Sequence, residues 1–501
     1  MLLFDRLRAA LHRLPEGGPA YRQAFRRFRR DFPEYATTHT LTQLRRRELS
    51  RLDTTGHAYL DYTGGGLYPD SLLRRHHALL GRHVFGNPHS SNPSSQAMTA
   101  LTEEARAAVL RYFGADPAEY TAIFTQNASG ALKLLGEAFP FAPGSQLLLT
   151  EDNHNSVNGI REYARRAGIE TTYAPLRPDD LRLDEPALHQ LLARPAGPGP
   201  RLFGLPAQSN FSGVQHPLSW VAEAQAAGWR VLLDAAAYVP TSRLSLGEVR
   251  PDFVSVSFYK MFGYPTGLGC LLARREALRE LRRPWFAGGT VSMVSVSGDM
   301  HQLVGDEAAF EDGTVNYLNI PAVQFGLEFM EEMGVDCIKA RVRSLTGWLL
   351  AELQSLRHPN GAPLIHLLGP TDLEARGGTI AFNVHGPDGR AFPIELVEER
   401  ANAENISLRT GCFCNPGAGE AASHLTRAEI LAVVQSCASK ATLRDMQLGV
   451  PDKEVGAVRV SVRYATSFRD VFRLRQYLGG YLGLPAPVRN SPAPARVEMG
   501  A

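Results

Sequence analysis

The segment DFVSVSFYKMFGYPTGLGCLL, residues 252–272, decides the fold of this chain. Its first residues form an apolar run typical of a buried strand, which then ends in a polar, aromatic turn that carries Lys260. Gly263, Gly267 and Gly269 follow, and they favour a tightly turning backbone beside the lysine. A lysine after a strand is usually a solvated surface residue, but at the lip of a sheet it is also placed to bond covalently to an aldehyde.

A second strand ends in a carboxylate. The segment WRVLLDAAAY, residues 229–238, runs an apolar strand directly into Asp234. Asp234 and Lys260 follow consecutive predicted strands, and adjacent strands of this kind bring both residues to one ligand. A carboxylate there keeps a pyridine nitrogen protonated, whereas its ordinary alternative is a helix N-cap. The pair predicts a site for pyridoxal 5'-phosphate (PLP).

Short apolar runs alternate with helical stretches from about residue 51 onward. The runs interpreted as buried strands are 58–63, 121–125, 146–150, 201–206, 229–234 and 252–257, and helices are expected at 131–139, 158–168 and 220–228. Such repeats predict an α/β fold with a mostly parallel sheet and helices on both of its faces.

The chain divides into four predicted segments. These are an N-terminal helical arm (1–50), a large PLP-binding domain (51–325), a smaller α+β C-terminal domain with a cysteine loop (326–485) and a disordered, Pro/Ala-rich tail (486–501). The arm is rich in arginine and is interpreted as a solvated amphipathic segment, with a membrane-surface or acidic-partner role as the alternative. A long helical stretch at 321–356 links to strands at 379–386 and 457–464.

Composition limits the possible functions. Of 501 residues, 44% are hydrophobic and 21% charged, and the net charge of +2 gives no electrostatic case for nucleic acid. No apolar run is long enough to span a bilayer, and the N-terminus lacks the pattern of a secretory signal. Five cysteines form too sparse and odd a set for a disulfide framework, so we expect a reducing, cytoplasmic location.

The segment SLRTGCFCNPGAGE, residues 407–420, places Cys412 and Cys414 two positions apart in a Gly/Pro-rich loop. This spacing is shorter than the Cys-x-x-Cys of redox and zinc sites, and no second cysteine pair accompanies it, so we expect no metal site. A thiolate in such a loop is a nucleophile, and the nearby Arg409 would lower its pKa below about 8.5. Inert buried thiols are the alternative.

The order of these motifs resembles the class V aminotransferase group of PLP enzymes. Within it, YLDYTGGGLY (59–68), SFYK (257–260) and RTGCFCNPGA (409–418) are most similar to the N-terminal cysteine desulfurase part of molybdenum cofactor sulfurases. The resemblance covers roughly residues 30–485 and implies a PLP-dependent transferase fold with a seven-stranded type of sheet. It implies that L-cysteine is converted to L-alanine and that its sulfur remains as a persulfide on Cys414, with Cys412 as the fallback.

The resemblance assigns roles to five matched residues. Lys260 matches the Schiff-base lysine, Asp234 the partner of the pyridine nitrogen, and His154 the histidine that stacks on the ring and moves protons. Asn210 matches the amide near the phenolic oxygen, and Arg459 the arginine that binds the substrate carboxylate. Taken alone, the last three residues are equally well interpreted as a helix cap, an Asx turn and a surface arginine.

The cofactor phosphate is expected at the start of a helix. Ala128 and Ser129 open a predicted helix, where an anion binds readily and where an ordinary N-cap gives the same sequence. Ser257 and Tyr259 would add hydroxyl contacts. Thr314 matches a threonine that in relatives reaches the phosphate of the neighbouring subunit, which implies a homodimer.

Three positions depart from the pattern of the family. Tyr259 stands where many desulfurases have histidine, Ala237 where many have glutamine, and Gly419 where a third cysteine is frequent. Full cofactor sulfurases continue into a domain that binds the molybdenum cofactor, so we expect the sulfur acceptor to be a separate partner: that cofactor or a carrier protein. An aminotransferase, a cysteine β-lyase, a selenocysteine lyase and a non-enzymatic scaffold remain as alternatives.

Overall fold

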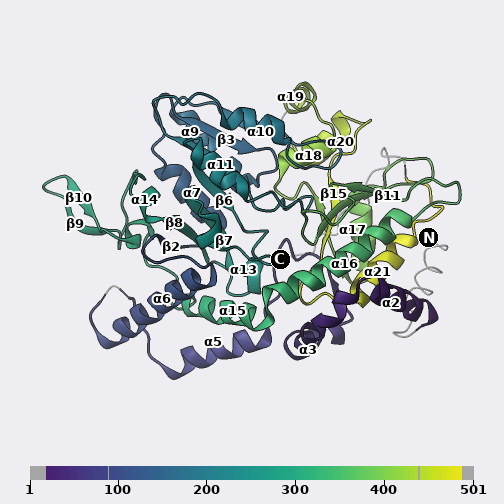
Figure 1. Ribbon diagram of the computed structural model, residues 1–501, viewed down its shortest axis with the longest axis horizontal. Coiled ribbons are helices and arrows are strands. Elements are labelled where there is room, and N and C mark those ends of the chain that lie inside the picture. Colours follow the sequence, from purple (N-terminus) through teal and green to yellow (C-terminus); the bar gives the residue numbers. More distant parts are fainter. Residues whose placement is uncertain (1–17, 89, 438–440, 488–501) are drawn as a thin grey trace.

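A computed structural model describes residues 18–88, 90–437 and 441–487 of the chain, which form two lobes (Figure 1). The larger lobe contains a seven-stranded sheet in the order β2-β8-β7-β6-β5-β3-β4. Its strands are β2 (Tyr120–Thr125), β3 (Gln146–Thr150), β4 (Thr171–Ala174), β5 (Arg201–Pro206), β6 (Arg230–Asp234), β7 (Phe253–Ser257) and β8 (Gly269–Arg274). Only β8 runs antiparallel to its neighbours, so the predicted, mostly parallel sheet is confirmed.

Successive residues of the central strands are buried on opposite faces of this sheet. Leu147 and Leu149 of β3 pack in one hydrophobic cluster with α7 (Ala128–Ala138), whereas Leu148 packs in the other cluster with α11 (Ser219–Ala226). Side chains of a strand alternate between its two faces, and both faces are covered here by helices. The strands are therefore continuously apolar, which made them recognisable in the sequence.

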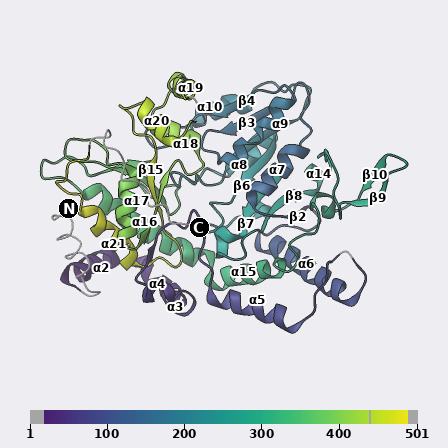
Figure 2. The same ribbon diagram turned by 180° about the vertical axis from the view of Figure 1, so that it is seen from behind.

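The smaller lobe has an antiparallel four-stranded sheet in the order β11-β12-β15-β14. Its strands are β11 (Ile365–Leu368), β12 (Thr379–Val384), β14 (Arg409–Gly411) and β15 (Ala457–Ser461). The helices α16 (Val335–Ser355), α17 (Ile394–Ala403) and α21 (Phe468–Gly479) belong to the same lobe (Figure 2). The predicted strands 379–386 and 457–464 are thus neighbours in one small sheet.

One expectation about the elements was wrong. Residues 58–63 do not join the large sheet, because β1 (Ala58–Tyr59) pairs in parallel with β13 (Ile406–Ser407) and Asp61 forms a bridge with Ser461. The stretch 321–356 is helical as expected, and it forms two helices, α15 (Ile320–Met333) and α16, which are separated at Gly334 with φ of 74°. α15 packs on α6 (Pro93–Tyr112) of the large lobe, whereas α16 packs on α21, so we propose the lobe boundary at Gly334 rather than at residue 325.

The N-terminal segment packs against the small lobe through α2 (Pro19–Asp31) and α3 (His39–Glu48). Its exposed arginines include Arg26 and Arg29, but Leu41 and Leu44 are buried, and Phe28 stacks on Phe468 at 4.7 Å between ring centroids. The segment is amphipathic as predicted, yet its apolar side is part of the core rather than solvated. The predicted tail falls mainly on residues 488–501, which lie outside the described residues. Among the described helices, none combines the length and apolar character needed to cross a membrane.

Candidate functional site

Lys260 and Asp234 lie at the carboxyl ends of adjacent parallel strands. β6 ends at Asp234, and Lys260 follows β7 on the short helix α13 (Phe258–Phe262). Asp234 Oδ1 accepts hydrogen bonds from Ser255 Oγ at 2.8 Å and from the Ala236 amide at 3.1 Å. Burial lowers the pKa of the Lys260 amine, and the charge of Asp234 acts in the opposite direction. A lysine with a lowered pKa is a better nucleophile toward a carbonyl group.

The turn after Lys260 requires glycine. Gly263 has φ of 78°, and a Cβ on it would lie 2.3 Å from the Leu67 carbonyl carbon. A side chain at this position would push apart the backbone of residues 67–68 and the helix that carries the lysine. The glycine that the sequence placed beside Lys260 therefore serves both a left-handed turn and a close backbone approach.

Small polar groups gather at the start of α7. The amide of Ala128 donates to Ser257 Oγ at 2.9 Å, and the hydroxyls of Ser129 and Ser156 are 2.5 Å apart. His154 Nδ1 accepts from the Ser156 amide at 3.1 Å. The structure thus brings together all the predicted phosphate contacts on α7 and β7, at a helix N-terminus that favours an anion.

His154 is electrostatically coupled to the lysine. Burial lowers the pKa of His154, the charge of Lys260 lowers it further, and Asp234 acts in the opposite direction. The charges of Lys260 and Asp234 therefore both act on His154, as expected for groups around one ligand. A lowered pKa leaves the imidazole neutral at pH 7, able either to accept or to donate a proton.

Arg459 of β15 is only 2% exposed and points into the interface between the lobes. It donates to the Asn210 carbonyl oxygen at 2.9 Å and to Asp61 Oδ1 at 3.1 Å, and its guanidinium lies 4.5 Å from the Phe413 ring centroid. Burial lowers its pKa to about 10, partly offset by Asp61. Its Nε has no hydrogen-bond partner among the described residues, which leaves a buried donor for a carboxylate ligand.

The cysteine loop is held by its backbone while one thiol stays accessible. Cys414 is exposed, whereas Cys412 is partly buried, and burial raises the Cys412 pKa. The Cys412 carbonyl oxygen accepts from the backbone N–H of Asn415 at 2.9 Å, and the Cys414 carbonyl oxygen accepts from the backbone N–H of Asn155 at 2.7 Å. Between them, the carbonyl oxygen of residue 413 accepts from Asn210 Nδ2 at 2.7 Å. Two anchors from the large lobe therefore hold the loop so that Cys414 lies next to the segment that contains His154.

Phe413 and Cys414 both have φ of 55°, in the left-handed region that non-glycine residues rarely occupy. Such strain persists only where surrounding contacts impose it, and it concentrates at functional sites. Burial has the largest effect on the pKa values of Lys260 and Tyr259, and the charge of Cys414 raises both. Half-buried Tyr259 also has a pKa raised by burial.

Two predicted site residues have unexpected neighbours. Both polar atoms of the Asn210 side-chain amide bond to the cysteine loop. Nδ2 donates to the Phe413 carbonyl oxygen at 2.7 Å, and Oδ1 accepts from Asn415 Nδ2 at 2.9 Å. Thr314 is exposed, and its hydroxyl accepts from Asn87 at 3.3 Å. No contact among the described residues joins Thr314 to the group around Lys260.

Sequence reasoning missed Gln208 and Arg463, which line a small cavity with Lys260 and Ala237. The Arg463 guanidinium donates to the carbonyl oxygens of Lys260 and Met261, so it holds the lysine helix in place. Gln208 supplies an amide near Ala237, where many desulfurases have glutamine. The signals were present, since Gln208 precedes Asn210 in QSN and Arg463 repeats the alternation that identified Arg459.

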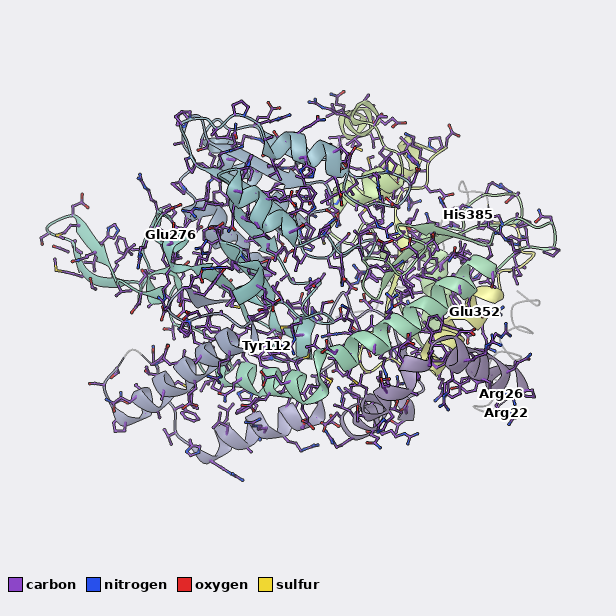
Figure 3. The ribbon with its side chains drawn as sticks, in the orientation of Figure 1. Arg22, Arg26, Tyr112, Glu276, Glu352 and His385 are labelled. Carbon is purple, nitrogen blue, oxygen red and sulfur yellow. The ribbon has the colours of Figure 1, made fainter. Side chains whose placement is uncertain are left out.

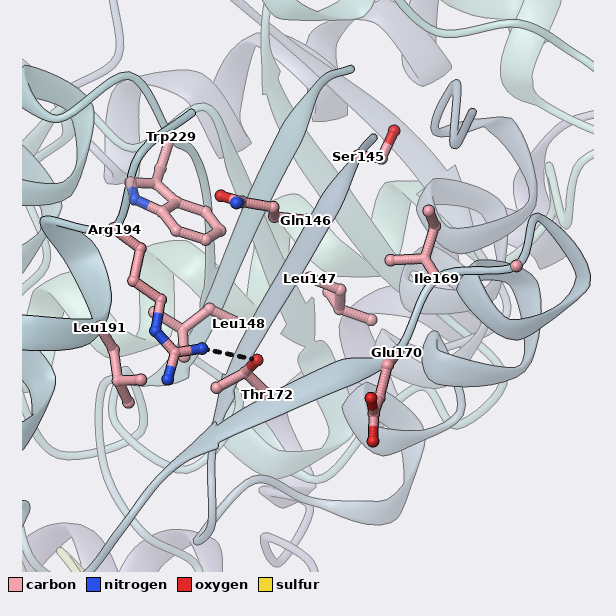
Figure 4. A pocket seen from close by; sticks show the side chains of 11 residues that line it. Ser145, Gln146, Leu147, Leu148, Ile169, Glu170, Thr172, Leu191, Arg194 and Trp229 are labelled. Carbon is pink, nitrogen blue, oxygen red and sulfur yellow. Dashed lines mark hydrogen bonds between the residues drawn. The ribbon is translucent and has the colours of Figure 1, made fainter. Parts of the chain in front are cut away.

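A separate pocket lies at the opposite edge of the sheet, at the amino ends of β3 and β4 (Figure 4). Its lining includes Gln146, Glu170 and Trp229, and Arg194 bonds to Thr172 Oγ1 at 3.4 Å across it. It contains neither lysine nor cysteine. The carboxyl edge, with Lys260 and Cys414, is therefore the candidate site, as expected for a parallel sheet.

Comparison with known proteins agrees with this geometry. Residues 58–474 match the family model described as aminotransferase class-V. This chain belongs to the class-V aminotransferase family. The molybdenum cofactor sulfurase of Bos taurus is 37% identical over 453 residues, which cover 86% of this chain and 50% of that protein. The chain spans about half the length of the curated relatives it matches.

Solved structures confirm the PLP-dependent transferase fold predicted from the motifs. A cysteine desulfurase from Thermococcus onnurineus NA1 in its apo form superimposes with a TM-score of 0.71 at 22% identity, covering 88% of this chain and 97% of that one. A mutant of C-DES with glycine covalently linked to its PLP cofactor has a TM-score of 0.66 at 19% identity, covering 87% and 99%. The predicted family resemblance is likewise confirmed.

Proposed function

We propose that this chain is a PLP-dependent cysteine desulfurase, which converts L-cysteine to L-alanine and leaves the sulfur as a persulfide on Cys414. The observation that carries the proposal is geometric: half-buried Lys260 and Asp234 follow adjacent parallel strands. The loop with the exposed Cys414 thiol is anchored beside them, because the Cys414 carbonyl oxygen accepts from the backbone amide of Asn155, the residue after His154, at 2.7 Å. A lysine and a carboxylate suit the cofactor, and a separate accessible thiol suits sulfur transfer. The names of the relatives and of the structural neighbours support the same chemistry.

The residues at the strand ends fit PLP. Lys260 would hold its aldehyde, Asp234 would keep its pyridine nitrogen protonated, and the start of α7 with Ser129 and Ser257 would hold its phosphate. Tyr259 would add a hydroxyl contact. When bound, PLP supplies an electron sink that weakens the bonds at the substrate α-carbon.

The side chains around this position would divide the remaining work. Arg459 binds the substrate carboxylate through its paired N–H groups, which orients the α-carbon toward Lys260. The Lys260 amine moves the α-proton, and neutral His154 accepts or donates protons beside it. Asn210, tied to the loop, positions the backbone on which the acceptor thiol lies.

Sulfur transfer would use the Cys414 thiolate. Its Sγ forms a bond with the substrate sulfur, the carbon–sulfur bond breaks, and the electron pair of that bond goes to the substrate carbon. A proton from Lys260 then completes alanine. No external oxidant is needed, because the sulfur atoms are oxidised to the persulfide level while the substrate carbon is reduced by the same electron pair.

The test is incubation of the PLP-loaded protein with L-cysteine. We expect equal amounts of alanine and transferable sulfur, and mass spectrometry should place one added sulfur atom on Cys414 in peptide 407–420. Cys414→Ala should lose both while retaining the cofactor absorbance, and Cys412→Ala is the matched control that retains activity. Pyruvate in place of alanine would indicate a β-lyase, and a requirement for a keto acid would indicate an aminotransferase.

We also propose that the chain works as a homodimer in the cytoplasm. Exposed Thr314, which is not joined to the Lys260 group of its own chain, would reach the cofactor phosphate of a second copy. The sulfur acceptor would be the molybdenum cofactor named for the relatives, or a carrier protein. Sedimentation analysis of the unmodified protein tests for the dimer. Thr314→Ala should weaken the retention of PLP and leave the dimer intact.

A further inference from the structure

Two histidines and a glutamate meet on the small lobe. His366 lies on β11, His385 directly follows β12, and Glu454 lies in the loop before β15. One ligand atom from each side chain lies within 4.8 Å of the other two. None of the three lines the cavity that contains Lys260, and Figure 3 shows His385 in the small lobe.

The register of two antiparallel strands brings the histidines together. His366 pairs with Asn383, so His385, two positions further along, lies diagonally opposite on the same face of the sheet. The two rings are 5.5 Å apart between centroids. His385 Nε2 lies 2.9 Å from Glu454 Oε1, so a loop and two strands converge on one point.

Neighbouring groups prepare these side chains as ligands. Buried Asn383 donates from Nδ2 to Glu454 Oε2 at 3.0 Å, which orients the carboxylate. His385 Nε2 also lies within hydrogen-bond distance of both carboxylate oxygens of Glu454, at 2.9 and 3.0 Å, so the imidazole and the carboxylate already face one another.

We propose that His366, His385 and Glu454 form a binding site for Zn²⁺. Two imidazole nitrogens and one carboxylate oxygen are ligands that Zn²⁺ accepts, whereas Mg²⁺ and Ca²⁺ prefer oxygen alone. Zinc–ligand distances of about 2.1 Å place tetrahedral ligands about 3.4 Å apart. The exposed His366 ring would move inward to reach this spacing, and water would complete the fourth position.

The ion would tie the cysteine loop to the small sheet. The carbonyl of Glu454 accepts from Ser423 Oγ at 2.6 Å, and Ser423 caps α18 (Pro416–Ala422). This helix begins two residues after Cys414. A bound ion would therefore fix the far end of the helix that follows the loop, so the site is structural rather than catalytic.

The test uses full-length Cys412→Ala/Cys414→Ala protein, because the loop thiols bind zinc themselves. After removal of metal with a chelator, equilibrium dialysis against Zn²⁺ and elemental analysis should find one ion per chain. Zinc should also raise the midpoint of thermal unfolding. His385→Ala in this background should weaken binding at least tenfold and abolish the zinc-dependent rise, and His366→Ala should do the same.

His189→Ala, a change at an exposed histidine of the large lobe, is the matched control and should bind zinc as the parent does. Far-ultraviolet circular dichroism confirms that each variant is folded before metal is added. Zinc binding that is unchanged in both His366→Ala and His385→Ala would overturn the proposal. So would the absence of any bound zinc in the folded parent, and neither result would touch the desulfurase proposal.

Discussion

Asp61 Oδ1 lies 3.1 Å from a terminal nitrogen of Arg459, the arginine proposed to bind substrate. Its other oxygen accepts from Arg409 at 2.6 Å, at the start of the strand that leads into the cysteine loop. One carboxylate therefore joins the substrate arginine to the loop that bears the acceptor thiol. A substrate carboxylate would compete with Asp61 for the same guanidinium, which couples substrate binding to the segment before Cys414.

The change Asp61→Asn should destabilise the protein by about 2 kcal/mol, because the buried charge of Arg459 loses its compensating partner. Urea unfolding at pH 7 measures this free energy. Added alanine, whose carboxylate can pair with Arg459, should restore part of the loss.

The control is Asp388→Asn, which makes the same chemical change in an exposed ion pair with Arg390 and should cost less than about 1 kcal/mol. Equal losses in the two variants would show that Asp61 does not offset a buried charge.

Three of the five thiols should react with iodoacetamide in a fixed order. Cys414 is exposed, whereas burial raises the pKa of Cys412 and, more strongly, that of Cys270. Because the thiolate is the reactive form, we expect Cys414 to be alkylated at least about tenfold faster than Cys412, and Cys270 to remain unmodified. Peptide mass spectrometry at pH 8 gives the rates, and the difference should vanish in urea. Faster labelling of Cys412 would transfer the acceptor role to it.

The sequence predicted the large sheet because each strand is buried on both faces and reads as a continuous apolar run, as in residues 201–206. It failed for residues 58–63, where two extended residues precede a glycine-rich turn and pair with a distant segment of the chain. The exposed arginines of the N-terminal segment were visible in the pattern. The burial of its apolar side was not, because it depends on distant segments of the chain, as where Phe28 packs on Trp348 of α16 and Phe468 of α21.

The site divides in the same way. Lys260 and Asp234 were predictable because each directly follows a strand, so position along the chain determines position in the sheet. Asp61 was not, because its role depends on two arginines nearly 350 and 400 positions away in the chain. The two hydrogen bonds between Asn210 and the cysteine loop likewise form a contact between lobes, which no local sequence pattern indicates.

The free energy of unfolding should decrease as the pH is lowered, and part of this decrease should depend on His154. Burial lowers its pKa in the folded protein, so below about pH 6.5 the unfolded chain binds a proton that the folded chain does not. The favourable contribution is therefore complete above this range and is lost as the pH falls. Between pH 7.5 and 5.5 the apo protein should lose up to about 1.4 kcal/mol more than His154→Gln.

Urea unfolding of both cofactor-free proteins at the two pH values measures this difference. His57 and His366 also have pKa values lowered by burial, but they are present in both proteins and cancel. His189→Gln should behave as the parent. A parent and a His154→Gln variant with the same pH dependence would show that His154 is not held neutral by the fold.

The two glycines of α18 should respond oppositely to alanine. A Cβ on Gly417 would lie 2.1 Å from the backbone oxygen of Glu151, which cannot move without shifting the end of β3. Gly417→Ala should therefore displace the cysteine loop, cost about 1–3 kcal/mol and lower persulfide formation on Cys414. At Gly419 the nearest atom would be Phe211 Cε2 at 3.8 Å, an ordinary contact. Gly419→Ala should leave sulfur transfer unchanged and stabilise the helix by about 0.5–1 kcal/mol. If both variants lost persulfide formation equally, displacement of the cysteine loop would not be the cause of the loss.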